Sequence, residues 1–292
     1  MPDWITHIAT AAVYPKRTVD FRLMLLGAVL PDAWMPLHIA ASDLVSMSGN
    51  SFMLYTVPWH TPFMMLLVSL VIALFTRDVL RSWLVLSAFS LLHILFDSFV
   101  LHYGIYIIHA YPFYYRPLYR GFIPFNAAML YAAPFVLLPS FVLIWKRHVP
   151  VPIFTWSWKR VLPAAVLVAL VAVLPLVTRQ RLVDSGYHYL KFYENPASFE
   201  GKRVAFCISR VTSVDPLTVL EMGGRYMLDT AGKDYGLKKG NVISFDGVYT
   251  NGVVRVGTVA KYEPRTKSFM SLFGLAFLGM LFLRSLRLRG SR

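Results

Sequence analysis

Long apolar runs separated by short polar segments dominate the first 180 residues of the chain. A helix needs about 20 apolar residues to cross a membrane, and several of these runs approach that length. The pattern predicts spans over 21–40, 62–76, 83–103, 126–145, 161–178 and 268–283, and a helix over 4–14 that is too short to cross alone. We therefore expect an α-helical multi-pass membrane protein with about six spans plus a short N-terminal half-membrane helix.

The pattern changes to strand-like alternation after residue 180. Five stretches alternate apolar and polar positions, and Gly-rich turns (MGG, KKG, TNG) lie among them: KRVAFCISRV, LTVLEM, RYMLDT, NVISFDGVYT and VVRVGTVAKY. One helical turn is expected at KDYGLKKG, between the third and fourth strands. This arrangement resembles a small all-β OB-fold barrel. We expect three units: a helical membrane domain (1–179) with a metal site, an inserted OB-like barrel (180–266), and a C-terminal transmembrane helix with a basic tail (267–292).

Charge adds an orientation to this picture. The net charge is +14, and the six acidic residues before residue 180 are all Asp, whereas the other nine acids follow it. With six spans, the main Lys and Arg clusters fall on one side, which the positive-inside rule assigns to the cytoplasm. We therefore expect a plasma-membrane protein with both termini cytoplasmic and the barrel facing outward.

Two classes of function become less favoured. Nucleic-acid binding is not expected, because the barrel sequence has no row of aromatics interleaved with Lys and Arg. The single cysteine, Cys207, permits neither an intrachain disulfide nor a thiolate metal cluster.

The segment SLLHILFDSF places His93 and Asp97 inside a predicted span. At a spacing of four residues they lie on the same face of a helix. Ionisable groups inside a span are costly, usually face the bundle interior and mark functional sites. The alternative is a His–Asp pair that only locks two helices together.

Other segments bring matching groups to a similar depth. We place Arg22, Lys16 and Arg81 at the inner membrane surface. At a helical rise of about 1.5 Å per residue, Asp32 then lies about 15 Å above that surface, His7 about 13–14 Å and His93 about 18 Å. His60, in VPWHTPF, caps the outer start of the second span. Three imidazoles and two carboxylates are suitable ligands for a divalent ion, Zn²⁺ first, with Mn²⁺ or Fe²⁺ possible. His38, His102 and His109 are weaker candidates for the same site.

The ordered set of motifs resembles the YdjM-type membrane-bound predicted metal-dependent hydrolases over about residues 1–125. The matching segments are THIAT (Thr6, His7), LPD (Pro31, Asp32), PWHTP (His60, Thr61), LLHILFD (His93, Asp97) and AYPF (Tyr111, Pro112, Phe113). The resemblance implies hydrolase activity in an inner-membrane protein, and it names no substrate.

We therefore expect a membrane-embedded metal-dependent hydrolase. Its expected substrate is amphipathic, a lipid or lipid-linked phosphoester, with Asp32 or Asp97 as the general base. Arg116 and Arg120, in YYRPLYRGF, are candidates for a phosphate clamp, and their alternative role is interfacial anchoring. The competing hypothesis is a non-catalytic metal-binding scaffold whose barrel binds a partner protein. An intramembrane metalloprotease is a weaker third, because the chain lacks H-E-x-x-H. The pattern does not predict an oligomeric state.

Overall fold

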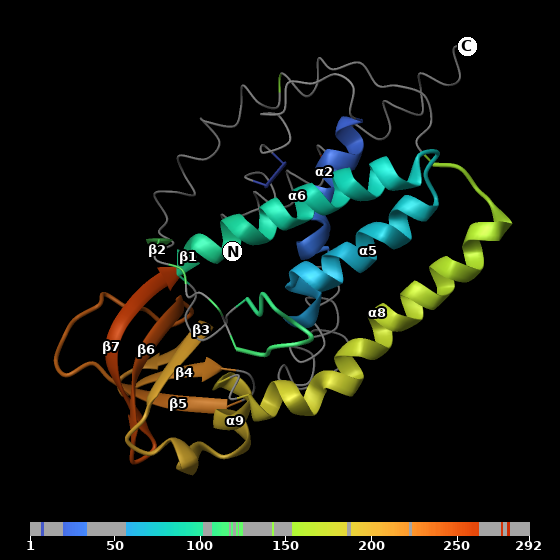
Figure 1. The fold of residues 1–292 in the computed structure, drawn as a ribbon. Helices are drawn as coiled ribbons and strands as arrows, with labels where there is room; N and C mark the ends of the chain where they lie inside the picture. The colour runs from blue at the N-terminus through green and yellow to red at the C-terminus, as the bar shows by residue number, and fades with distance from the viewer. Residues whose placement is uncertain are drawn as a thin grey trace.

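The protein, seen here as a computed structural model, has a helical part and a β-barrel at one end of it (Figure 1). The structure describes residues 7–8, 20–33, 57–101, 107–116, 118, 121, 123–124, 142, 154–185, 188–221, 224–262, 276 and 279–280. The helical part contains α2 (Phe21–Val29), α5 (Pro62–Leu74), α6 (Val79–Phe99) and α8 (Trp158–Asp184). Two 3₁₀ turns, η1 (Leu30–Asp32) and η2 (Val57–His60), and a parallel pair of short strands, β1 (Val100–Leu101) and β2 (Ile123–Pro124), complete it.

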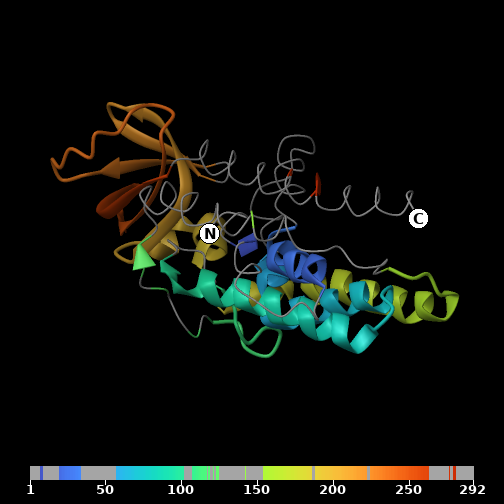
Figure 2. The ribbon, with the colours of Figure 1, turned by 90° about the horizontal axis from the view of Figure 1, so that it is seen from above.

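Helix α6 is the centre of the helical part. It packs against α2 and α5, while α8 packs against α5 (Figures 1 and 2). Leu23, Ala73 and Leu86 form one buried cluster between α2, α5 and α6. Met64 and Val171 belong to another cluster, between α5 and α8. The elements that later prove to carry the site are therefore held by apolar burial on both sides of α6.

Gly27 lets α2 approach α6 closely. A Cβ added at this residue would lie 2.6 Å from the Leu86 carbonyl oxygen and 3.0 Å from Phe89 Cβ. Backbone atoms cannot yield to such a contact without moving the helix. The absence of a side chain at Gly27 thus sets the spacing of the two helices.

Hydrogen bonds join the start of α8 to the end of α5. The Arg160 guanidinium donates to the carbonyl oxygens of Leu74 and Thr76, at 3.0 Å and 2.5 Å. The backbone N–H of Thr155 donates to the Phe75 carbonyl at 2.7 Å. Carbonyls at a helix end lack partners within the helix, and here a neighbouring segment supplies them.

The barrel contains five strands: β3 (Arg203–Val214), β4 (Leu217–Glu221), β5 (Gly224–Asp229), β6 (Val242–Thr250) and β7 (Val253–Tyr262). It closes in the order β3-β4-β5-β7-β6, with β5 and β7 parallel and the other pairs antiparallel. Closure leaves no free sheet edge. Helix α9 (His188–Glu194) and the turn η3 (Pro196–Phe199) precede it, and Phe192 of α9 packs among Phe206 and Phe245 in the barrel core. The predicted small OB-like barrel is confirmed at this level.

One detail of the barrel prediction is wrong. Residues 233–240, KDYGLKKG, form turns and irregular backbone and contain no helical turn. Gly236 and Gly240 adopt positive φ values of 57° and 88°, which a right-handed helix does not allow. The helix adjoining the barrel core is α9, which lies before the first strand.

The predicted fold of about six membrane spans is also wrong. In the described part of the chain, two helices, α6 and α8, are long and apolar enough to cross a membrane, and α5 is shorter, beside a closed five-stranded barrel. Within predicted span 21–40, α2 ends at Val29, because Pro31 cannot donate the next helical hydrogen bond. Predicted spans 126–145 and 268–283 lie almost wholly outside the described residues, and of the short helix over 4–14 only His7 and Ile8, both helical, are described.

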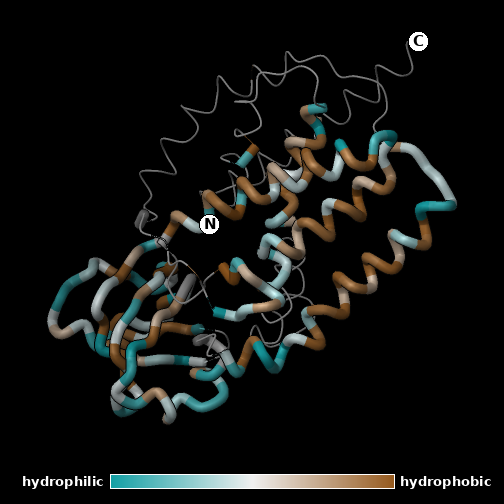
Figure 3. Tube along the Cα trace, viewed as in Figure 1, coloured by the Kyte–Doolittle hydropathy of each residue, from teal (hydrophilic) through white to brown (hydrophobic). Residues whose placement is uncertain are grey.

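The exposed surfaces of the long helices support membrane association. On α8, seven Leu and Val side chains are between 42% and 73% exposed: Leu162, Val166, Val168, Leu170, Val173, Leu176 and Val177. Figure 3 shows apolar residues concentrated along α5, α6 and α8, whereas the barrel mixes apolar and polar positions. Large exposed apolar faces of this kind suit a lipid environment. The cytoplasmic placement of both termini stays a prediction from charge.

Candidate metal centre

The site begins with the break in α2. Pro31 has no N–H, so it cannot donate to the carbonyl of Gly27, its partner four residues earlier. That carbonyl instead accepts a hydrogen bond from Ser90 Oγ on α6, at 3.0 Å. The next carbonyl, that of Ala28, lies 2.7 Å from His93 Nδ1. Two backbone acceptors at the end of α2 are thus used to fix side chains of α6.

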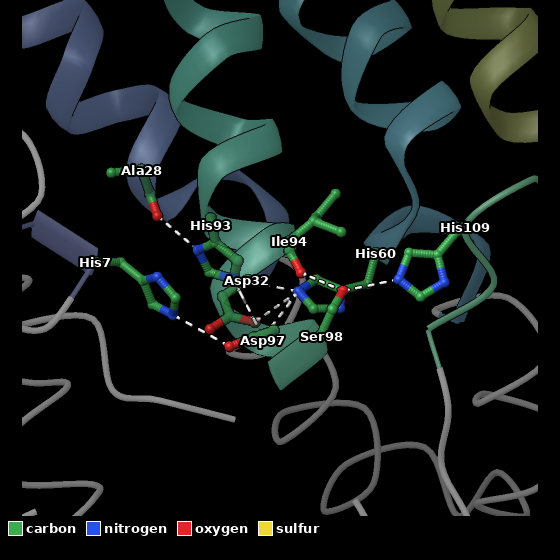
Figure 4. A network of polar contacts seen from close by, with 9 residues as sticks. All are labelled: His7, Ala28, Asp32, His60, His93, Ile94, Asp97, Ser98 and His109. Carbon is green, nitrogen blue, oxygen red and sulfur yellow. Dashed lines mark hydrogen bonds and ion pairs between the residues drawn. The ribbon is translucent and has the colours of Figure 1, made fainter. Parts of the chain in front are cut away.

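The contact with Ala28 decides which nitrogen of His93 carries hydrogen. A carbonyl oxygen only accepts, so Nδ1 must be the donor. The neutral ring then has its lone pair on Nε2. This is the tautomer a metal-binding histidine adopts when its other nitrogen donates to a backbone carbonyl. His93 Nε2 faces the carboxylates of Asp32 and Asp97 (Figure 4).

His60 reaches the same point from η2, just before α5. Thr61 Oγ1 donates to the Pro58 carbonyl at 2.6 Å and closes the turn that holds His60. Pro62 then begins α5, where a missing N–H has no cost. The His60 side chain is buried, with its Nε2 3.2 Å from His93 Nε2.

Asp32, His60, His93 and Asp97 form a compact cluster, in which one ligand atom from each lies within 4.8 Å of the others. Asp97 Oδ2 is 3.2 Å from His60 Nε2 and 3.5 Å from His93 Nε2. Asp32 Oδ1 is 3.9 Å and 3.8 Å from the same two nitrogens. Zn–N and Zn–O bonds of about 2.0–2.2 Å place tetrahedral ligand atoms roughly 3.3 Å apart. The cluster therefore has nearly the spacing that one ion requires.

The burial and charge of the cluster also favour a bound metal ion. All four side chains are buried, and Asp32 Oδ1 receives no hydrogen bond from the described residues. Two carboxylates removed from water at close range are costly unless a positive charge compensates them. A divalent cation supplies that charge and uses the lone pairs of the two imidazoles. The cluster can hold a metal ion, and its chemistry does not select one metal.

His7 adjoins the cluster but lies outside the group of four. Its ring stacks on that of His93, with centroids 3.5 Å apart and an interplanar angle of 14°. Its Nε2 is 3.5 Å from Asp97 Oδ1, while the other oxygen of Asp97 faces His60 and His93. His7 is therefore placed to orient Asp97 rather than to share the same ligand position.

The predicted phosphate clamp is not assembled among the described residues. Arg116 lies exposed in a bend and makes none of the cluster's contacts described above. Arg120 lies outside the described residues, as do His38 and His102.

The sequence pattern did not reveal the roles of Ser90, Ser98 and the Ala28 carbonyl. His109, a weaker candidate, contacts Ser98 at 2.8 Å and lies beside the cluster (Figure 4). The available signal was a hydroxyl residue one turn before His93, Ser90, and another directly after Asp97, Ser98.

Comparison of the chain with known proteins adds no relative. No family model, curated protein or solved structure matches it. The resemblance to the YdjM-type hydrolases thus stays a prediction based on the order of motifs, and the functional argument depends on the geometry of the cluster.

Proposed function

We propose that the protein is a membrane-associated metal-dependent hydrolase in which His60, His93 and Asp97 bind one divalent ion and Asp32 faces the same point as the general base. Zinc is the first choice for this donor set, and manganese or iron is the alternative. The supporting observation is the convergence of four buried ligand atoms within 4.8 Å of one another from three segments, η1, η2 and α6. When bound, the ion lowers the pKa of a coordinated water toward neutrality and polarises the bond to be cleaved.

The residues divide the remaining work. Asp97 is held from both sides, since one oxygen meets His7 and the other meets His60 and His93. Asp32 has the longer contacts, at 3.8 Å and 3.9 Å. We therefore assign Asp32 the role of taking a proton from the attacking water, and Asp97 the role of a fixed ligand.

A phosphoester with an apolar group is the substrate class we favour. Water would form the new bond to phosphorus, the ester bond to the lipid oxygen would break, and the proton held by Asp32 would pass to that oxygen. The apolar faces of α6 and α8 support a substrate that resides in a membrane. Arg116 and Arg120 remain candidates for contact with the phosphate, which Arg binds in a bidentate manner.

A metal-binding scaffold is the second candidate function. Four protein ligands can complete a tetrahedral zinc site and leave no position for water, as in structural sites. In that case the barrel would bind a partner protein, and the metal would only join η1, η2 and α6.

The test is the metal content of the purified protein, measured by elemental mass spectrometry. We expect about one zinc or manganese per chain in the wild type and a loss in His93→Ala. His188→Ala, in α9 at the barrel, is the matched control and should retain the metal. Metal-free wild type after reconstitution would contradict the site, and would leave His93 and Asp97 as a pair that locks helices.

A second measurement separates enzyme from scaffold. Metal-loaded protein is incubated with lipid phosphoesters, and released phosphate is measured for wild type, Asp32→Asn and His188→Ala. We expect hydrolysis that Asp32→Asn reduces by 10²-fold or more while metal is retained. Full metal content without hydrolysis of any phosphoester would favour the scaffold.

A further inference from the structure

A hollow of about 420 Å³ lies on the surface of the barrel, away from the metal cluster. Its walls come from the second half of β3, from β4 and β5, and from the turn before β6. Three of the lining residues are cations, and none of the lining residues that the structure describes is Asp or Glu. The side chains that matter here are Arg210, Thr212, Ser213, Thr218, Arg225 and Lys239.

Strand register brings the two arginines of the hollow together. Arg210 of β3 is paired with Leu220 of β4, and Leu220 is paired with Arg225 of β5. Directly paired residues lie on the same face of a sheet, and neighbouring strands are about 4.8 Å apart, so the two arginines start about 10 Å apart. All three side chains are exposed. Two guanidinium groups on long stems can therefore close on an anion held between them.

The turn that carries Lys239 is fixed to the same strand. The Lys238 backbone N–H donates to Asn241 Oδ1 at 2.8 Å and closes the turn. The Gly240 N–H donates to the Val211 carbonyl, and the Val211 N–H donates to the Asn241 carbonyl, both at 2.8 Å. The third cation is thus carried by backbone that is already ordered, which lowers the entropy lost when a ligand binds.

The arginines of the hollow differ from the other arginines of the barrel in their charge partners. Arg203 and Arg255 each form an ion pair with an aspartate, at 2.6 Å and 3.7 Å. Arg210 and Arg225 form no ion pair with a carboxylate in the part of the chain that the structure describes. Positive charges gathered without counter-charges attract anions to a surface. The hollow is therefore suited to an anionic ligand.

The chemistry of the lining indicates which anion fits. Thr212 Oγ1 and Thr218 Oγ1 lie 3.0 Å apart, and when Thr212 donates in this contact the hydrogen of Thr218 can go to a ligand oxygen. Guanidinium, ammonium and hydroxyl donors are those that bind phosphate. Three cations match the charge of a phosphomonoester, about −1.5 to −2, better than that of one carboxylate. No aromatic residue among those described lines the hollow, so nucleic-acid bases would have nothing to stack on.

We propose that this hollow binds the phosphate group of a small anionic ligand, either a soluble phosphate ester or a lipid head group. The barrel lies beside the C-terminal ends of α6 and α8 (Figure 1), so a membrane crossed by these helices would bring head groups to this end of the molecule. The site shares no residue with the metal cluster, and it stands apart from the hydrolase function proposed above.

Protection of arginine from phenylglyoxal tests the site at the residues concerned. Full-length protein in nonionic detergent is treated at constant ionic strength, and modification is measured by peptide mass spectrometry. Inorganic phosphate or glycerol 3-phosphate should slow modification of Arg210 and Arg225 by about fivefold or more relative to chloride, because a bound phosphate occupies both guanidinium groups. Arg255, whose side chain is 74% exposed, is the internal control and should react at an unchanged rate.

A second arm distinguishes the two sources of phosphate. The protein is placed in lipid nanodiscs of phosphatidylcholine, with or without phosphatidic acid, and no soluble phosphate is added. Protection by soluble phosphate in detergent identifies a soluble ligand, whereas protection only in discs with phosphatidic acid identifies a lipid head group. Either result supports the site.

A pair of lysine variants separates a defined site from general attraction to positive charge. Lys239→Gln should raise the concentration of phosphate needed for half-protection by roughly fivefold, the effect of losing one exposed ion pair. Lys238→Gln is the matched control, because it makes the same charge change one residue away and Lys238 does not line the hollow.

Four results would overturn the proposal. They are no protection in either arm, equal protection of Arg255, equal effects of the two lysine variants, and protection by a single-stranded oligonucleotide where neither phosphate source protects.

Discussion

At the scale of single residues, the cluster separates groups that bind from groups that position. His60, His93, Asp32 and Asp97 direct ligand atoms at one point, whereas His7 contacts the outer oxygen of Asp97. The Ala28 carbonyl fixes the tautomer of His93. Each positioning contact fixes the orientation or tautomer of a ligand without itself touching the ion, which is the role that outer partners have in metal sites.

Substitutions of the ligands should weaken metal binding more than substitutions of the positioning residues. We expect Asp97→Asn and His93→Ala to remove most metal binding, because the first replaces an anionic carboxylate by a neutral amide and the second removes a ligand atom. His7→Ala should weaken affinity by roughly 10- to 100-fold, the effect of losing an outer partner. Competition with a chelator of known affinity gives these values. If His7→Ala were as severe as His93→Ala, His7 would be a ligand and the group of four would be incomplete.

The sequence predicted these side chains but not what holds them. His93 and Asp97 could be paired from their spacing of four residues, Asp32 was placed by its depth in an apolar run, and His60 by its position at the outer start of the second predicted span. The Ala28 carbonyl could not be predicted in this way, because every residue has a carbonyl and only the break at Pro31 shows which one becomes available. The pairing of Ser98 with His109 requires a loop to return to α6, and short-range patterns do not report such contacts.

At the scale of elements, the contact of α2 with α6 determines the geometry of the site. Gly27→Ala should push the helices apart, since the new Cβ would meet the Leu86 carbonyl at 2.6 Å. We expect a lower melting temperature and weaker metal binding, because Ala28 and Asp32 move away from His93. Gly279→Ala is the control, because a Cβ there meets nothing within 4 Å. Equal melting temperatures and metal content in the two variants would show that this contact is not required.

Apolar runs located three of the helices but not where each one ends. The predicted spans 62–76, 83–103 and 161–178 overlap α5, α6 and α8, whereas α2 covers less than half of 21–40. Hydropathy averages over a window, so it does not register one proline that removes a backbone donor. Strand alternation located the five strands of the barrel well, because its period of two differs clearly from the helical period. It could not exclude a helical turn at KDYGLKKG, where the glycines adopt positive φ.

At the scale of the whole molecule, the barrel has a core of its own and a buried carboxyl group. Burial raises the pKa of Glu221 to about 7, and a hydrogen bond donated by Ser209 offsets part of that rise. The folded barrel therefore favours the protonated form. Its stability should be highest below about pH 4.5 as far as Glu221 is concerned, fall as the pH rises toward 7, and then level off.

Glu221→Gln should remove this pH dependence. A pKa rise of this size corresponds to about 3 kcal/mol, so the variant should be more stable than wild type at pH 8 by up to that amount. Urea unfolding with limited proteolysis, read on peptides from 203–262, measures the barrel separately from the helices. Glu194→Gln, an exposed change in α9, is the control. An unchanged slope of stability between pH 5 and 8 in Glu221→Gln would contradict the prediction.

The order of the ligands along the chain has a consequence for biogenesis. The four clustered groups and His7 all lie within the first 97 residues, whereas α8 and the barrel follow residue 157. During synthesis, N-terminal units generally fold first. The ligand-bearing segments are therefore complete while the barrel is still untranslated, and a nascent chain that ends after β1 already contains every residue needed to capture the ion. Metal supply at the time of translation, rather than after assembly, would then decide which ion the protein acquires.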